Sequence, residues 1–214
     1  MRLLNTQVYP KKRLNLFPKN NLYYLFTYFV NKRYNVSIIV DKMEMGCMKI
    51  MVASDVHGSI KHLKILYKNY LDEKPSQMIF LGDMFDNMLG VDDTLLEILK
   101  GFSPCIFIRG NCDKEMNYLD FVSDYSLEAF GKKIFCSHGH IYDRHLFPDE
   151  DFDVMIGGHT HIGMIFLEGD KYFLNPGSVS LPKGFSKNSY MILDDEGIYL
   201  KDLEQKIIEY KNWK

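Results

Sequence analysis

Hydrophobic and polar positions change in blocks along the chain from Met48 onward. Short apolar runs, most of them followed by a polar cluster, alternate at first with stretches in which Leu and Tyr recur at the three- and four-residue spacing of an amphipathic helix. That spacing predicts a helix from Ser59, its N-cap, to about Leu71, and a second helix around 93–100. The apolar runs predict strands at 49–54, 77–81, 105–109, 127–130, 133–136, 154–156, 163–167, 172–174, 190–193 and 198–203.

The order of these elements predicts the fold class. A strand–helix–strand–helix–strand order over 49–109 requires parallel strands joined by right-handed crossovers. The closely spaced strands after about Tyr125, with tight turns such as 168–170, indicate mostly antiparallel pairing. We therefore predict an α/β protein in which two mixed β-sheets pack face to face with helices on the outside.

The first 47 residues do not share this pattern. Residues 1–40 hold seven Lys and Arg and no Asp or Glu, and their apolar run, 22–30, is shorter than the roughly 20 residues of a membrane-spanning helix. They have neither the order of a secretory signal nor the Ser content of a transit peptide. We expect an N-terminal extension, 1–47, that is untranslated or disordered, with translation starting at Met45 or Met48, and a single folded domain, 48–214. N-terminal sequencing of the native protein tests this, and a mature chain that begins at residue 1 or 2 contradicts it.

Composition and charge exclude several classes of protein. The chain has 46% hydrophobic and 25% charged residues and a formal net charge of -2, unlike proteins that coat nucleic acid or seek anionic membranes. Residues 41–214 carry 19 Lys and Arg against 28 Asp and Glu, so this part is acidic. The cysteines form no C-x-x-C pair, as expected for reduced thiols. We expect a cytoplasmic protein with no nucleic-acid or membrane partner.

Five polar clusters follow the apolar runs, and all are rich in oxygen and nitrogen donors. One such turn is ordinary loop chemistry, but five in order indicate a site, because ligands gather where the strands of such a sheet end. Two neighbouring divalent cations repel each other and need a shared carboxylate, for which Asp83 is the candidate. Glycines beside the donors permit sharp turns and the close approach of a phosphate. The clusters are 55–58, 82–86, 110–113, 137–140 and 157–161, and the glycines are Gly82, Gly110, Gly139 and Gly158.

In this order the clusters resemble the calcineurin-like metallophosphoesterase superfamily and, within it, the small YfcE-type phosphodiesterase branch. The segment 175–184, Asn-Pro-Gly-Ser-Val-Ser-Leu-Pro-Lys-Gly, which comes after the paired histidines, is typical of that branch. The resemblance covers Met48 to about Leu203 and implies a four-layer αββα sandwich.

The resemblance also implies two divalent metal ions. Asp83 would bridge them and, with Asn111 and His138, carry the catalytic roles, while a water or hydroxide between the metals attacks phosphorus. Manganese is expected by family analogy, with Ni, Fe and Zn as alternatives, because nitrogen and oxygen donors suit all four. His140 is an alternative ligand to His138, which is preferred because it directly follows a predicted strand. One metal would take Asp55, His57, Asp83 and His161, and the other would take Asp83, Asn111, His138 and His159.

The candidate substrate contacts are Arg109, Asn111, Cys112 and His140. Many relatives have His at the place of Cys112, and a thiol is a poorer proton donor, so leaving groups that are already good anions are expected. Simple packing is the favoured interpretation of Cys112. Arg109 suits a phosphate clamp or a structural ion pair equally, and His140 suits a phosphate contact or an ordinary loop position. Asp113 is expected to orient Asn111 or a metal-bound histidine.

The leading prediction is a phosphoric diester hydrolase, a metal-dependent phosphodiesterase acting on a small or activated diester. A phosphomonoesterase or nuclease of the same superfamily is the first alternative, against which Cys112 and the acidic domain argue. The second alternative is a non-catalytic partner-binding scaffold like the retromer subunit, although all seven implied ligands are present here. The expected partner is a small-molecule phosphodiester, and the sequence is compatible with a homo-oligomer.

Overall fold

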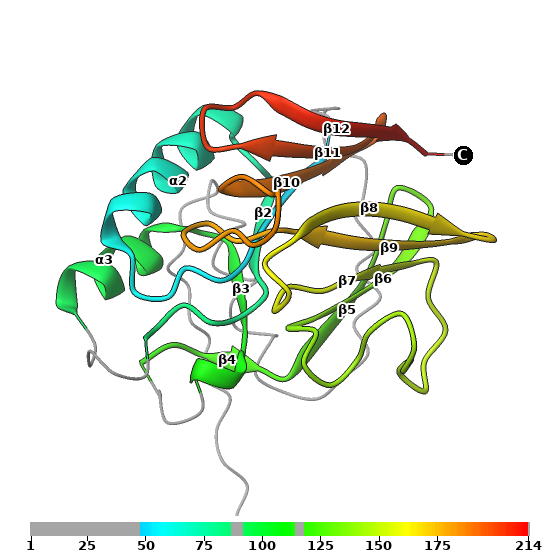
Figure 1. Cartoon of the computed structure of the whole chain (residues 1–214), viewed down its shortest axis with the longest axis horizontal. Helices are drawn as coiled ribbons and strands as arrows, with labels where there is room; N and C mark the ends of the chain where they lie inside the picture. Colours follow the sequence, from blue (N-terminus) through cyan, green and yellow to red (C-terminus); the bar gives the residue numbers. More distant parts are fainter. Residues whose placement is uncertain (1–47, 87–91, 114–117, 214) are drawn as a thin grey trace, which may run out of the picture. The chain divides into compact units, whose positions relative to one another are not determined.

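The computed structural model describes residues 48–86, 92–113 and 118–213, so the predictions for 1–47 lie outside the described residues. Within the described part the chain forms two β-sheets and two α-helices, α2 (Ile60–Glu73) and α3 (Asp93–Gly101) (Figure 1). The predicted fold class, with two mixed sheets packed together, is confirmed. In the part of the chain described here, no helix is long and apolar enough to cross a membrane.

The first sheet has a parallel half and an antiparallel half. Its strand order is β12-β11-β10-β1-β2-β3-β4, and β1 to β4 are parallel, as the alternation of strands and helices predicts. β10 pairs antiparallel with β1, and β11 and β12 follow as hairpins. The strands are β1 (Lys49–Ala53), β2 (Gln77–Phe80), β3 (Cys105–Ile108), β4 (Phe121–Val122), β10 (Ser189–Asp194), β11 (Gly197–Asp202) and β12 (Ile207–Asn212).

The second sheet has a parallel centre, which the sequence did not reveal. Its order is β5-β6-β7-β9-β8, and β6, β7 and β9 are parallel, with antiparallel hairpins only at the two edges. The crossover from β6 to β7 runs through 138–153, a segment with no helical period. The strands are β5 (Asp124–Ala129), β6 (Lys132–Ser137), β7 (Val154–Ile156), β8 (Gly163–Glu168) and β9 (Lys171–Pro176).

Three apolar layers hold the described elements together. Between the sheets, alternate side chains such as Val52, Ile79 and Ile156 form a buried core. The other face of the first sheet packs on α2 and α3, which lie side by side over it (Figure 1). The outer face of the second sheet is covered by the crossover segment, whose Tyr142 and Phe152 pack on Phe135 and Phe173. Among the described residues, therefore, α-helices cover one outer face and an aromatic loop covers the other.

The helix ends differ in how they are capped. Ser59 is the N-cap of α2, as predicted, but its hydroxyl contacts the His62 ring at 2.7 Å and makes no side-chain cap bond. Lys74, in the left-handed conformation, ends that helix. α3 is capped by Asp92, whose carboxylate accepts a hydrogen bond from the Thr94 N–H at 2.7 Å.

A nearly buried carboxylate ties α2 to the first sheet. Glu73, with a side chain 8% exposed, accepts hydrogen bonds from the ammonium groups of Lys49 and Lys201 and from the Tyr190 hydroxyl. Burial alone would raise the pKa of Glu73, but the hydrogen bonds from Lys201 and Lys49 outweigh it and hold that pKa below its usual range. The helix end is thus fixed to β1, β10 and β11.

We expect Glu73→Gln to lower the free energy of unfolding at pH 7 by about 1–2 kcal/mol, because it removes the charge from these hydrogen bonds. Folding lowers the pKa of Glu73. The stabilisation by its carboxylate is therefore fully present above the pKa of the unfolded chain, about 4.3, and is lost as the pH falls through the pKa of the folded protein. Urea unfolding between pH 3 and pH 7 should show that the free energies of unfolding of Glu73→Gln and the natural protein become equal in acid.

Glu204→Gln is the matched control, because Glu204 pairs with Lys206 on the surface and both side chains are more than 70% exposed. It should leave stability nearly unchanged. A difference between Glu73→Gln and the natural protein that is constant with pH would contradict the assigned role of the carboxylate.

Candidate metal centre

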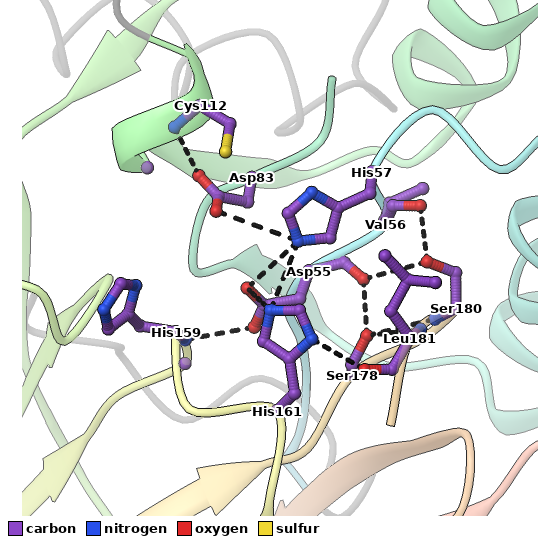
Figure 2. A network of polar contacts seen from close by, with 12 residues as sticks. Asp55, Val56, His57, Asp83, Cys112, His159, His161, Ser178, Ser180 and Leu181 are labelled. Atoms are coloured by element: carbon purple, nitrogen blue, oxygen red, sulfur yellow. Dashed lines mark hydrogen bonds and ion pairs between the residues drawn. The ribbon is translucent and has the colours of Figure 1, made fainter. Parts of the chain in front are cut away.

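The seven predicted ligands come together at the carboxyl ends of parallel strands from both sheets. Asp55 and His57 follow β1, Asp83 follows β2, and Asn111 follows β3 in a short 3-10 turn. The second sheet contributes the remaining ligands, with His138 directly after β6 and the other two histidines, His159 and His161, in the loop after β7. Figure 2 shows the side chains of Asp55, His57, Asp83 and His161 converging from three loops, and the backbone N–H of His159 donating to Asp55.

Five of the ligand residues have a strained, left-handed backbone conformation that directs their side chains into the site. Asp55, His57, Asp83, His159 and His161 have φ between 44° and 63°, and they are five of the eight non-glycine residues with positive φ in the described ranges. This left-handed conformation costs roughly 1 kcal/mol for each such residue and persists only where surrounding contacts impose it. Those contacts include backbone hydrogen bonds that join the two loops, from Asp55 N–H to the Gly82 carbonyl and from His57 N–H to the Asp83 carbonyl.

The first group of donors surrounds a buried oxygen of Asp55. Its Oδ1 lies 3.3 Å from His161 Nε2 and 3.7 Å from His57 Nε2, and it has no hydrogen-bond partner among the described residues. The Leu181 carbonyl accepts a hydrogen bond from His161 Nδ1 at 2.6 Å, which places the proton of the neutral ring on Nδ1 and leaves Nε2 as an acceptor. Asp83 Oδ2 lies 3.8 Å from His57 Nε2 and completes this group.

The second group of donors shares Asp83. His138 Nε2 lies 3.4 Å from Asp83 Oδ2 and 3.0 Å from Asn111 Oδ1. His138 Nδ1 donates to the Leu81 carbonyl at 2.8 Å, so Nε2 of the neutral ring is an acceptor. It faces two other acceptors, the carboxylate oxygen of Asp83 and the amide oxygen of Asn111. His159 belongs to the same cluster, since one ring nitrogen lies within 4.8 Å of the ligand atoms of Asp83 and His138.

These donors fit divalent cations. Acceptor atoms that face each other in a buried site are unfavourable without a cation or proton between them, and the unpartnered Asp55 Oδ1 is the clearest instance. The donor set is carboxylate, imidazole and amide, which suits Mn, Fe, Ni or Zn. Asp83 is common to both groups, as the resemblance implies for a bridging ligand.

Without a metal ion, the carboxylates and imidazoles of this site shift one another's pKa. Burial would raise the pKa of Asp55 and Asp83, but the neighbouring histidines outweigh it, so both pKa values lie below their usual range. Burial lowers the pKa of His138, yet its contact with Asp83 prevails and raises that pKa. The contact with Asp55 raises the pKa of His161 in the same way. A bound cation therefore competes with protons for these rings.

A buried aspartate supports the bridging residue. Asp113 is fully buried, and its Oδ2 accepts hydrogen bonds from the N–H groups of Asp83 at 2.7 Å and Gly110 at 3.0 Å, while Oδ1 accepts one from Phe85 at 3.2 Å. Burial raises the pKa of Asp113. The sequence led us to expect that Asp113 orients Asn111 or a metal-bound histidine, whereas in the structure its carboxylate accepts hydrogen bonds from the backbone of the Asp83 loop and of Gly110.

Two serines from the segment after β9 and an asparagine at the end of β9 fix the other loops in place. The hydroxyls of Ser178 and Ser180 donate to the Asp55 carbonyl, at 2.7 Å and 3.3 Å (Figure 2). Asn175 Nδ2 donates to the Gly158 carbonyl at 2.7 Å and so fixes the loop that carries His159. This bracing gives the Asn-Pro-Gly-Ser segment a structural role that the sequence alone did not assign.

One glycine is required by close packing around the bridging residue. A Cβ on Gly110 would lie 2.1 Å from Asp83 Oδ1 and 2.3 Å from the Asp83 nitrogen, so a side chain there must displace the bridging carboxylate or its backbone. A Cβ on Gly157 would meet only ordinary contact, at 3.5 Å from Gly139 Cα. The space beside Asp83 is thus reserved for a residue without a side chain.

The predicted substrate contacts have different surroundings. The Asp113 carbonyl accepts a hydrogen bond from Arg109 Nη1 at 2.7 Å, and the guanidinium lies 4.4 Å from the centre of the Phe121 ring, which are structural contacts. The exposed His140 ring has its centre 5.3 Å from that of His138. It lines a pocket of about 190 Å³ that also includes Asp124, Ser137 and Tyr142.

Cys112 lies directly against the bridging carboxylate. Its N–H donates to Asp83 Oδ1 at 2.8 Å, and its sulfur is within 4.8 Å of ligand atoms of Asp83 and His57. Burial and the charge of Asp83 raise the pKa of the Cys112 thiol to about 12. The residue therefore borders the site through both its backbone and its side chain.

Comparison with known proteins places this geometry in a family. Residues 48–197 match the model of the calcineurin-like phosphoesterase superfamily domain. Phosphodiesterase YfcE of Escherichia coli (strain K12) is 30% identical over 168 residues, covering 70% of this chain and 89% of the relative. The probable metallophosphoesterase YsnB of Bacillus subtilis (strain 168) is 29% identical over 182 residues, covering 75% and 99%. The solved structure of the E. coli YfcE phosphoesterase matches with a TM-score of 0.71 and 28% identity, over 78% of this chain and 100% of that one.

We expect Gly110→Ala to weaken binding of Mn²⁺ at least tenfold, because the added methyl group displaces Asp83 from both donor groups. Isothermal titration calorimetry on the purified protein measures the change. Gly157→Ala is the neighbouring control and should bind the metal normally. Equal affinity in the two variants would mean that the Asp83 carboxylate does not hold the metal.

Proposed function

Because this chain belongs to the calcineurin-like phosphoesterase superfamily, we propose that it is a metal-dependent phosphodiesterase acting on a small or activated phosphodiester. The observation that carries the proposal is the pair of carboxylate oxygens, Asp55 Oδ1 and Asp83 Oδ2, that face ring nitrogens across 3.3–3.8 Å. The 30% identity to a phosphodiesterase supports the diester as substrate.

Seven side chains of this chain would hold two divalent cations. Asp83 is shared, Asp55, His57 and His161 complete one set, and the other set is Asn111, His138 and His159. Cations bound there supply a water of lowered pKa, near 7, and offset negative charge on the phosphoryl oxygens. Manganese is our proposed native metal, with Ni, Fe and Zn as the metals to compare.

The protein's own groups orient the reaction. The carbonyls of Leu81 and Leu181 hold the His138 and His161 rings with Nε2 toward the centre of the site. The Asn111 amide and the exposed His140 ring lie on the His138 side, where they can contact the phosphodiester. Cys112 stands where many relatives have a histidine, and a thiol is a weak proton donor, so the proposed substrate releases a group that needs no protonation.

We expect Asp83→Asn to reduce diester hydrolysis at least a hundredfold and to weaken metal binding in parallel, because the shared ligand loses its charge. Circular dichroism should show a folded protein. Chelation should abolish turnover of the natural protein, and added Mn²⁺ should restore it.

Asp170→Asn, in the β8–β9 hairpin remote from the site, is the control and should retain full activity. Hydrolysis that continues undiminished in Asp83→Asn, or after complete chelation, would defeat the metal-dependent mechanism.

A comparison of bis-aryl diesters, aryl monoesters and cyclic nucleotides across the four metals then decides the substrate class. Diesters should be hydrolysed best. A strong preference for the monoesters would establish the phosphomonoesterase alternative, and no hydrolysis with any metal would favour the partner-binding scaffold.

A further inference from the structure

A short segment next to His161 is fixed to the site by backbone contacts. Besides the bond from His161 Nδ1 to the Leu181 carbonyl, the Lys183 N–H donates to the His161 carbonyl at 3.1 Å. The Gly163 N–H donates to Ser186 Oγ at 3.1 Å. These hydrogen bonds hold residues 181–186 against residues 161–163, which include the proposed metal ligand His161.

This segment presents an aromatic ring at the tip of a tight turn. The Ser186 N–H donates to the Lys183 carbonyl at 3.2 Å, Gly184 has φ of +63°, and Phe185 between them is fully exposed. Leu181 and Ile162, 53% and 48% exposed, continue the apolar surface toward His161. Because the turn is already ordered, an aromatic ligand can cover the ring at little entropic cost.

The same turn carries a positively charged side chain, that of Lys183. Lys183 is exposed, and its backbone N–H donates to the carbonyl of the proposed metal ligand His161, so its side chain starts from the edge of the site. Among the described residues Lys183 has no ion pair, whereas Lys187, a few residues on, pairs with Asp202 at 3.2 Å. The ammonium of Lys183 is thus available to an anionic ligand.

We propose that the turn Lys183–Ser186 recognises the substrate, with Lys183 contacting the negative charge of the phosphodiester and Phe185 stacking on the aromatic ester group that is retained when the leaving group departs. This inference rests on the proposed phosphodiesterase function and names its substrate class. An aryl group and a nucleobase both present the planar π face that a phenylalanine ring stacks against.

Three diesters with the same 4-nitrophenolate leaving group test the aromatic contact. The retained group is methyl in the first, phenyl in the second and thymidine, joined through its 5′ oxygen, in the third. We expect Phe185→Ala to lower kcat/KM about fivefold for the phenyl diester, the thymidine diester or both, and to leave the methyl diester within twofold. Loss confined to one of the aromatic diesters identifies whether a simple aryl group or a nucleobase is preferred. Ile207→Ala, at an exposed position on β12, is the control.

The same substrates test the charge. Lys183→Ala should lower kcat/KM about tenfold for all three diesters, because each carries the same negative charge, and the loss should shrink as ionic strength rises. Lys183→Arg should restore most of the activity. Lys187→Ala, the neighbouring control, should behave like the natural protein.

A binding measurement separates this inference from the proposed function. Calorimetric titration of the manganese-loaded protein with phenylphosphonate and methylphosphonate, which are not hydrolysed, should show a preference for phenylphosphonate that Phe185→Ala removes. If that preference is present but no diester is cleaved, the phosphodiesterase proposal fails while recognition by the turn stands. If diesters are cleaved and both variants match the natural protein, or if Phe185→Ala changes only the oligomeric mass, the recognition role is overturned.

Discussion

Acceptor atoms forced to face one another are the constraint on which the rest of this structure depends. Asp55 Oδ1 and Asp83 Oδ2 lie opposite Nε2 atoms of rings whose Nδ1 protons, at His138 and His161, are committed to carbonyls. Such an arrangement is unfavourable for folding by itself. The left-handed ligand residues, the buried Asp113 and the space kept free at Gly110 all maintain it. Stability is given up here to hold the donors in place.

The topology explains how distant parts of the chain reach this point. Parallel strands end at the same edge of a sheet, so β1, β2 and β3 deliver their loops together. The parallel centre of the second sheet, β6, β7 and β9, does the same from the other side. A purely antiparallel second sheet would send alternate loops to the opposite edge, and the histidines after β6 and β7 would be separated.

The sequence predicted most strands and both described helices because buried runs and helical spacing leave a local signal. β12 was missed because its side chains are mostly exposed and follow no alternation, and the two-residue β4 is too short to leave a pattern. A site was predicted because five similar clusters occur in order, and the family resemblance implied which donors form it. The role of Asp113 in holding the Asp83 loop was not predicted. Its contact with the backbone of Asp83, 30 residues earlier, depends on tertiary packing that a single sequence does not report.

Each group of donors draws ligands from both sheets, and this has a consequence for how the site can change. Asp83 comes from the first sheet, and its partners His138 and His161 come from the second. The interleaved Val52, Ile79 and Ile156 between the sheets therefore serve as a spacer, whose thickness sets the gap between opposing donors. A methyl group added to or removed from that apolar layer would change the distance between the donors of the two sheets, and with it the size of the ion that binds best, without any change in the ligands.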